Sequence, residues 1–167
     1  MTTTNFAAYF NQYIKQVDTQ EPVAALEETK QEFLNLLAKV DDEKGLYQYE
    51  DDKWSIKEVV SHVIDAERVF AYRAMSFARN DKTELAGFDD HLYAQNSGAN
   101  NRAMKELLKE FDLLRKASIA MFASFDKEMW PRVGTANGIT IDVKSIAYLI
   151  AGHCRHHRKI LQERYLI

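Results

Sequence analysis

Apolar residues recur with a helical period along most of this chain. The first such stretch begins at Pro22, because proline is favoured in the first helical turn, and Gly45 lies just beyond its end. Its apolar stripe consists of Val23, Leu26, Phe33, Leu36, Leu37 and Val40. We therefore predict a long helix over residues 22–41, preceded by a short lead-in helix over Phe6–Val17.

Three further stretches show the same period. Ser55 and Glu58 form a capping box, which is the clearest helix start in the chain. Asp142 can cap the last stretch through its side chain. The three helices are predicted over residues 55–79, 101–125 and 143–164.

The connections between these stretches differ in length. Residues 83–100 form a long one, and we expect it to be a partial lid over one end of the helices. Residues 134–141 are rich in turn-forming residues and suggest a small extended piece. Because the chain has only 6 glycines and 2 prolines and no internal repeat, the pattern predicts one all-α domain over residues 1–167, a four-helix bundle.

Composition and charge narrow the classes of function. Apolar residues make up 46% of the 167 residues and charged residues 28%, as in ordinary globular proteins. The net charge of −3 offers no basic surface for nucleic acid, so nucleic-acid binding is not expected. No run approaches the length of a membrane span, and the stretch MTTTNFAAYFNQYIK lacks a signal-peptide core. For this reason we expect no membrane contact. One cysteine permits no internal disulfide, which fits a reducing compartment, so we expect a cytoplasmic protein.

The candidate chemistry lies in the last predicted helix. His153 and His157 are four residues apart, so both imidazoles project from one side of the helix, the side that also carries Ile146. His156 lies on the flank of this face, and Cys154 lies off it. The two histidines therefore share the face that the aliphatic residues bury.

Two inward-facing histidines allow two interpretations. Each can be a core or surface histidine held by hydrogen bonds, and each then needs its own polar partner in an apolar setting. Alternatively, one metal ion binds both, and a third ligand is then expected, because two ligands rarely make a durable site. His62 lies on the inward stripe of the second helix, about two turns from its start, and is the natural third ligand.

Arg73 follows His62 on the same stripe, about three turns further along. An arginine on a buried stripe usually pairs with a carboxylate; the functional alternative is that Arg73 binds an anionic group in the same cavity. Glu58 and Asp65 flank the His62 face and are either solvated acids or groups that orient its second ring nitrogen. His91, in the long connection, is expected to be exposed and not a ligand.

Several of these segments also resemble sequence motifs of a known protein family. They are Lys53-Trp54-Ser55-Ile56-Lys57-Glu58-Val59-Val60-Ser61-His62, Asp65-Ala66-Glu67-Arg68, Arg73, Gly87-Phe88-Asp89, Gly152-His153, His156-His157 and Glu163-Arg164-Tyr165. In this order and spacing, from about residue 20 onward, the chain resembles the DinB/YfiT-like family of metalloenzymes. The resemblance implies an up-down-down-up four-helix bundle with a divalent metal, often nickel or zinc, on three histidines. By position these are His62, His153 and His157, the three that the spacing selected.

Three neutral imidazoles would leave a divalent ion at least one open position, which is typical of catalytic rather than structural sites. The spacing of His153 and His157 is also that of zincin proteases, but Cys154 replaces their glutamate base, so we reject a protease. The resemblance implies thiol-dependent S-transferases and isomerases, in which the ion activates a low-molecular-weight thiol such as bacillithiol, mycothiol or glutathione. An S-transferase acting on a small-molecule substrate, with Arg73 as a substrate-binding residue, is the leading hypothesis.

Two other functions are alternatives. One is a non-catalytic, stress-associated metal-binding bundle, and the other is a metal-dependent hydrolase of small molecules. An inward carboxylate near the metal would favour hydrolysis, whereas a cationic cavity wall would favour thiol transfer. Because homodimers are the commonest oligomers and bundles readily pair exposed apolar strips, we expect a homodimer.

Overall fold

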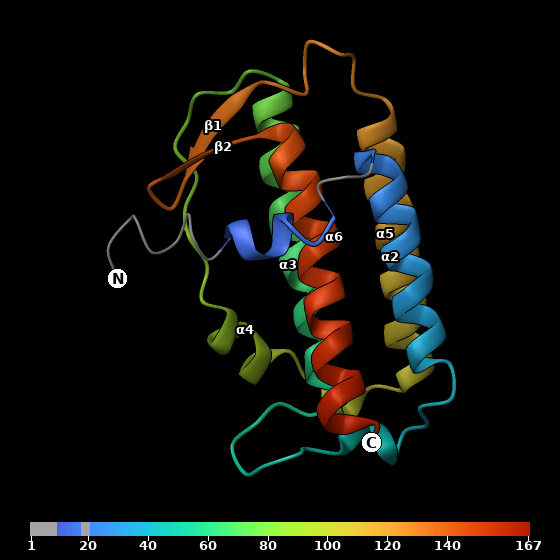
Figure 1. Cartoon of the computed structure of the whole chain (residues 1–167). Helices are drawn as coiled ribbons and strands as arrows, with labels where there is room; N and C mark the ends of the chain where they lie inside the picture. Colours follow the sequence, from blue (N-terminus) through green and yellow to red (C-terminus); the bar gives the residue numbers. More distant parts are fainter. Residues whose placement is uncertain (1–9, 18–20) are drawn as a thin grey trace.

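Four long helices lie side by side in the computed structural model, which describes residues 10–17 and 21–167 (Figure 1). They are α2 (Pro22–Leu37), α3 (Ile56–Ala78), α5 (Met104–Ala123) and α6 (Val143–Ile160). No helix in these described ranges is long and apolar enough to span a membrane. The prediction of a four-helix bundle is confirmed, and a two-stranded sheet is added to it.

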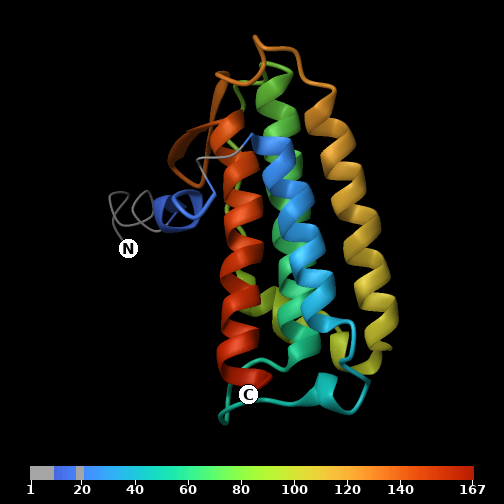
Figure 2. The same ribbon diagram turned by 45° about the vertical axis from the view of Figure 1, so that its right-hand side comes forward.

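The helices run up-down-down-up, as the family resemblance implied. Helices α2 and α6 point one way, and α3 and α5 point the other way (Figures 1 and 2). Each of α2 and α3 packs against both α5 and α6, so the consecutive helices α2 and α3 stand on opposite corners of the bundle. The neighbouring pairs α2–α6 and α3–α5 are therefore parallel.

This topology explains the long connection after α3. Because α3 and α5 are parallel neighbours, the chain has to return along the whole bundle before α5 can begin (Figure 1). The return contains a short helix, α4 (Asp90–Asn96), and a 3₁₀ turn, η2 (Ala99–Asn101), where we had predicted only a loop. The carboxylate of Asp89 caps α4 by accepting the backbone N–H of Leu92 at 2.9 Å. Helix α4 packs on α3.

The turn-rich link before α6 is a β-hairpin. Strand β1 (Val133–Ala136) pairs antiparallel with β2 (Ile139–Asp142). The two linking residues, Asn137 and Gly138, have φ of 52° and 73°, which a two-residue hairpin turn requires and which Asn-Gly tolerates best. Leu85 of the long connection lies along β1 and exchanges backbone hydrogen bonds with Thr135 and Asn137. The hairpin thereby fixes the start of the return segment.

Three helix ends differ by more than two residues from the sequence prediction. Helix α2 ends at Leu37 rather than at 41, where the chain turns into a 3₁₀ segment, η1 (Lys44–Leu46). Helix α5 begins at Met104 rather than at 101, because the Asp42 carboxylate accepts the Met104 N–H at 2.6 Å. Helix α6 ends at Ile160 and continues as a π turn, η3 (Leu161–Tyr165). Of the predicted lead-in helix, residues 10–14 are helical, and its start at Phe6 lies outside the described residues.

One charged group lies at the centre of the otherwise apolar core. Arg115 of α5 is fully buried, and its Nε donates to both carboxylate oxygens of Glu67 on α3 at 2.9 Å. Its Nη1 donates to the Leu26 carbonyl and the Thr29 hydroxyl on α2, each at 3.0 Å. The guanidinium also interacts with the Cys154 thiol on α6. All four long helices therefore meet at this residue.

Candidate metal centre

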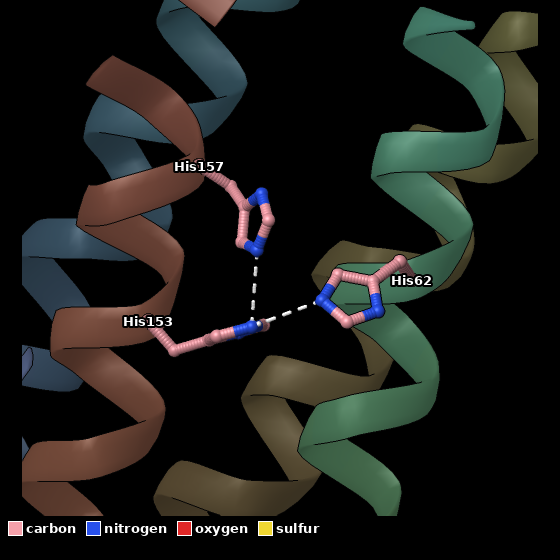
Figure 3. A group of neighbouring side chains, drawn as sticks. All are labelled: His62, His153 and His157. Carbon is pink, nitrogen blue, oxygen red and sulfur yellow. Dashed lines mark hydrogen bonds between the residues drawn. The ribbon is translucent and has the colours of Figure 1, made fainter. Parts of the chain in front are cut away.

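Helices α3 and α6 bring three histidines to one point. The capping box of Ser55 and Glu58 fixes where α3 begins, which places His62 two turns into the helix and on its inward side. His153 and His157 project from α6 toward it (Figure 3). The Nε2 atom of His153 lies 3.0 Å from that of His62 and 3.1 Å from that of His157. All three ligand nitrogens lie within 4.8 Å of one another.

Hydrogen bonding alone does not satisfy this arrangement. A neutral imidazole Nε2 carries either one N–H or one lone pair, so it can make one well-directed hydrogen bond. The Nε2 of His153 faces two other nitrogens at hydrogen-bond distance, and the two contacts compete for it. A cation between the three nitrogens would accept a lone pair from each. This observation favours the metal interpretation over three separately satisfied histidines.

The spacing of the nitrogens also fits a metal ion. With metal–nitrogen bonds of about 2.0–2.1 Å, two ligands are about 2.9 Å apart at a right angle and about 3.4 Å apart at the tetrahedral angle. The separations of 3.0 Å and 3.1 Å around His153 lie between these values. His62, His153 and His157 are therefore the residues that could hold a divalent ion.

The environment keeps these histidines neutral, which is the form that binds metal. Burial above all lowers the pKa of His62 to about 4; the charge of Asp90 opposes this shift, and the charges of His91 and His156 add to it. Burial, followed by the neighbouring histidines, holds the pKa values of His153 and His157 well below the ordinary value. Their lone pairs are thus available at neutral pH.

Aromatic rings enclose the cluster from two sides. The Trp54 ring packs against His62 with centroids 4.8 Å apart, and the Tyr165 hydroxyl donates to the Trp54 carbonyl at 2.8 Å. The Tyr13 ring meets His153 edge-on at 5.6 Å. This approach requires Gly152, because a Cβ there would lie 2.0 Å from the Tyr13 backbone oxygen. The rings restrict how the imidazoles can turn.

The other side chains near the cluster have separate roles. Of the two roles considered for Glu58 and Asp65, the structure shows no bond from either to His62: Glu58 accepts the Ser55 N–H, and half-buried Asp65 accepts from Arg68. Cys154 is buried on the side away from the cluster, where its thiol donates to the Thr29 carbonyl. This position agrees with its predicted place off the histidine face.

The two remaining histidines stay outside the cluster. His156 lies on the flank, half-buried, with its ring 5.0 Å from that of Tyr13. His91 is exposed on α4, as predicted, and its ring lies 5.3 Å from that of Trp54. Neither belongs to the group that could hold an ion among the described residues.

A pocket of about 950 Å³ opens beside the histidines, at the upper end of the size range of small-molecule sites. Its walls come from α3, α6, residues 10–13, the segment 87–91 and the hairpin turn. His62 and His153 lie on the wall, and so does Arg73. The segment that was expected to be a lid over one end of the bundle instead covers the side of the bundle along α3.

Arg73 does not pair with a carboxylate among the described residues, contrary to the usual expectation for a buried arginine. Its Nη2 donates to the Ala86 carbonyl at 2.8 Å, and the rings of Phe70 and Phe88 lie 5.8 Å and 6.0 Å from Cζ. Burial lowers the pKa of Arg73 from its ordinary value. Because an arginine side chain stays protonated in proteins even so, the guanidinium is a positive group on the pocket wall.

Part of this site was not predicted from the sequence. Trp54 comes directly before the N-cap Ser55 and lies outside α3, so the helical period does not place it beside His62; the usable signal was its position next to the capping box, where an apolar residue packs back on the start of the helix. Asp90 and Asn137 also line the pocket, but they come from the return segment and the hairpin turn. Nothing in the local sequence indicates that these two segments meet α3.

Comparison with known proteins agrees with the fold. No curated protein matches this sequence. YfiT from Bacillus subtilis, described as a probable metal-dependent hydrolase with an unusual four-helix bundle topology, superposes with a TM-score of 0.74 at 16% identity. The match covers 85% of this chain and 82% of that chain.

A mycothiol-dependent maleylpyruvate isomerase superposes with a TM-score of 0.71 at 10% identity, covering 87% of this chain. This chain spans 61% of the length of that protein. At such identities the two likenesses establish a shared fold. The sequence profile of the DinB superfamily matches residues 25–161, which is most of the chain. This protein therefore belongs to the DinB superfamily.

Proposed function

We propose that this protein is a metal-dependent enzyme that transfers a low-molecular-weight thiol to an electrophilic small molecule. The observation that carries the proposal is the cluster of His62, His153 and His157, whose Nε2 atoms converge at the wall of a pocket large enough for both reactants. When bound there, a divalent ion would lower the pKa of a thiol and keep it as the nucleophilic thiolate. Imidazole ligands suit nickel and zinc, so we propose one of these ions.

The protein's own residues would bind and orient the reactants. The rings of Trp54 and Tyr13 exclude water from two sides of the histidines. Arg73 supplies a positive charge on the wall of the same pocket for an anionic group of a reactant. The mycothiol-dependent neighbour, which shares the fold, makes a thiol a reasonable partner for this chain as well.

Hydrolysis is the second candidate, and Asp90 is the observation that favours it. Its carboxylate lines the pocket, and its charge acts on His62. YfiT, with the same fold, is described as a probable hydrolase. However, Asp90 Oδ1 already accepts the backbone N–H of His91, and Asp89 caps α4, so both carboxylates are partly engaged. Arg73 pairs with no carboxylate among the described residues and gives the pocket wall a positive charge. This charge favours thiol transfer.

A homodimer is also proposed, because large apolar side chains remain exposed on neighbouring helices. Tyr72 and Met75 of α3 expose 54% and 40% of their surface, and Leu113 of α5 exposes 56%. Pairing of these faces between two copies would bury them. Light scattering coupled to size-exclusion chromatography would give the mass directly, and a monomer at working concentrations would contradict the proposal.

The test begins with elemental analysis of protein purified without an affinity tag. We expect about one equivalent of nickel or zinc per chain, as three ligands at one point require. Substitution His62→Ala should remove the ion, whereas the matched control His156→Ala, on the flank of the same cluster, should keep it. The metal-loaded protein should then consume glutathione or a related thiol in the presence of an electrophile.

The possible outcomes separate the functions. Metal binding with hydrolysis of esters or amides, but without thiol consumption, would favour the hydrolase. Metal binding with neither reaction would favour a non-catalytic metal-binding bundle. Failure to bind any divalent ion after reconstitution would refute all three forms of the proposal.

A further inference from the structure

The pocket beside the histidines contains a buried positive charge whose counter-charge is absent from the described residues. Arg73 exposes 6% of its surface, and its one hydrogen bond there goes to the Ala86 carbonyl. Arg115, which is fully enclosed, is matched by the Glu67 carboxylate. A desolvated guanidinium without such a partner is costly to keep. An anion that enters the pocket would supply the missing charge.

The unused donors of Arg73 face the open volume of the pocket. Within the described residues, the enclosed polar side-chain atoms without a partner are Arg115 Nη2, Ser118 Oγ and Arg158 Nε. The nitrogens of Arg73 are not among them, although Nη2 alone has a hydrogen-bond partner. Its Nε and Nη1 are therefore accessible from the pocket. A guanidinium offers a carboxylate two in-plane donor pairs, Nε with Nη2 and Nη1 with Nη2, and Nη2 has a second N–H besides the one bonded to the Ala86 carbonyl.

The surroundings of this guanidinium are apolar and aromatic. Phe70 and Phe88 flank it, with their ring centroids 5.8 Å and 6.0 Å from Cζ. Leu149 and Ala66 continue the wall toward His153 and His62. Gln12, Asp90 and Asn137 also line the pocket. Next to the guanidinium itself, an apolar or aromatic body would fit the two rings, whereas amides placed there would stay unpaired.

The distance between the guanidinium and the histidines determines the size of the ligand. The Phe70 ring lies 5.8 Å from Arg73 Cζ and 6.1 Å from the His153 ring, so the two groups are at most about 12 Å apart. A molecule of up to this length, with several bonds between its anionic end and its reacting end, can therefore contact both.

We propose that the electrophilic substrate is an organic acid with an apolar or aromatic body. Its carboxylate binds an in-plane donor pair of the Arg73 guanidinium that includes the second N–H of Nη2, its body lies against Phe70 and Phe88, and its opposite end reaches the three histidines. This inference rests on the proposed function, because it assigns the carboxylate to the electrophile and not to the thiol. Arg73 is then the residue that selects acids over their neutral analogues.

The test compares phenylbutyrate with its neutral analogue phenylbutyramide by isothermal titration calorimetry. Metal-free protein is used, so that no ion can attract the carboxylate. We expect the acid to bind roughly tenfold to a hundredfold more tightly than the amide, the value of a charge-assisted pair. Arg73→Met should abolish this ratio without unfolding the chain, since it removes an unpaired buried charge.

Two control variants test whether the ratio of affinities depends on Arg73 itself and on its planar donors. Arg79→Met changes an exposed arginine on the same helix, outside the pocket, and should leave the ratio intact. Arg73→Lys keeps the charge but loses the planar pair of donors, so it should retain only part of the ratio. Equal affinities for acid and amide, a ratio that survives Arg73→Met, or no binding of the acid would each overturn the inference.

The same measurements distinguish this inference from the proposed function. A preference for the acid that depends on Arg73 in a protein that binds no metal would support the acid site and refute the metal chemistry. Metal binding with thiol consumption, but without any preference for the acid, would do the reverse. If glutathione bound through Arg73 while phenylbutyrate did not, the carboxylate would belong to the thiol, and the substrate assignment would be wrong.

Discussion

Substituting Glu67 by leucine would leave the most deeply buried charge of this protein without its partner. Both Glu67 oxygens lie 2.9 Å from Arg115 Nε, and the two side chains expose 2% and 0% of their surface. Removing one member of such a pair costs about 3–5 kcal/mol, because the other stays desolvated. The free energy of unfolding of domains of this kind is about 5–15 kcal/mol. We therefore expect Glu67→Leu to lower Tm by roughly 10 °C.

The double variant Glu67→Leu with Arg115→Met tests the reasoning. It removes both charges and leaves the Thr29 hydroxyl its bond to the Ala25 carbonyl at 2.8 Å. We expect it to recover most of the loss, to within about 1–2 kcal/mol of the unsubstituted protein. Urea unfolding of the metal-free protein, followed by far-ultraviolet circular dichroism, gives the three free energies. A loss of less than about 1 kcal/mol in Glu67→Leu, or a double variant no more stable than Glu67→Leu, would refute the argument.

The same double variant also tests whether this pair positions the metal centre. Arg115 connects α3, which carries His62, with α6, where its contact Cys154 adjoins His153. Without the guanidinium, only apolar packing fixes the position of α3 relative to α6 along the bundle axis, and such packing tolerates small shifts. We expect zinc affinity to fall about tenfold, as for other residues that support ligands. Unchanged zinc affinity in a stable double variant would limit Arg115 to a role in the core.

Three further predictions concern the histidine cluster and its neighbours. His62→Ala or His157→Ala should abolish stoichiometric metal binding by elemental analysis but preserve helical circular dichroism, because the core is apolar; unchanged metal content in both would contradict the three-histidine site. Burial raises the pKa of the Cys154 thiol to about 11, so it should resist iodoacetamide at about pH 8 until urea unfolds the chain. Rapid alkylation of the folded protein would show that Cys154 does not face the core, contrary to its assigned position on α6. Burial lowers the pKa of His62 from the ordinary value of 6.5 to about 4. Between these two pH values, His62 binds a proton in the unfolded chain but not in the folded chain. Metal-free protein should lose stability from pH 6.5 toward 4, and a flat unfolding free energy over this range would exclude the shift.

The sequence predicted the parts of the site that one helix presents by itself. His153 and His157 share a face because they are four residues apart, and the Ser55 capping box set the phase that turns His62 inward. The same phase placed Cys154 off this face, where the structure has it. These inferences needed only the helical period and a cap.

The sequence did not decide what surrounds these residues. Arg73 was expected either to pair with a carboxylate or to bind an anion, and its wheel position suits both. The tertiary structure decided this, because the return segment presents the Ala86 carbonyl, and no carboxylate among the described residues, to its guanidinium. The short helix α4, with Asp90 on the pocket wall, was missed for the same reason.

By itself, the sequence determined the four amphipathic helices, the inward side of each and the three histidines, because hydrophobic period and capping act between residues a few positions apart. The tertiary structure alone decided how α3 and α5 lie parallel, how the return segment closes the pocket, and which charges meet inside it. These features join residues far apart in the chain, such as Arg115 with Leu26 or Trp54 with Tyr165. Such contacts depend on how all the helices pack at once, and no local pattern encodes them.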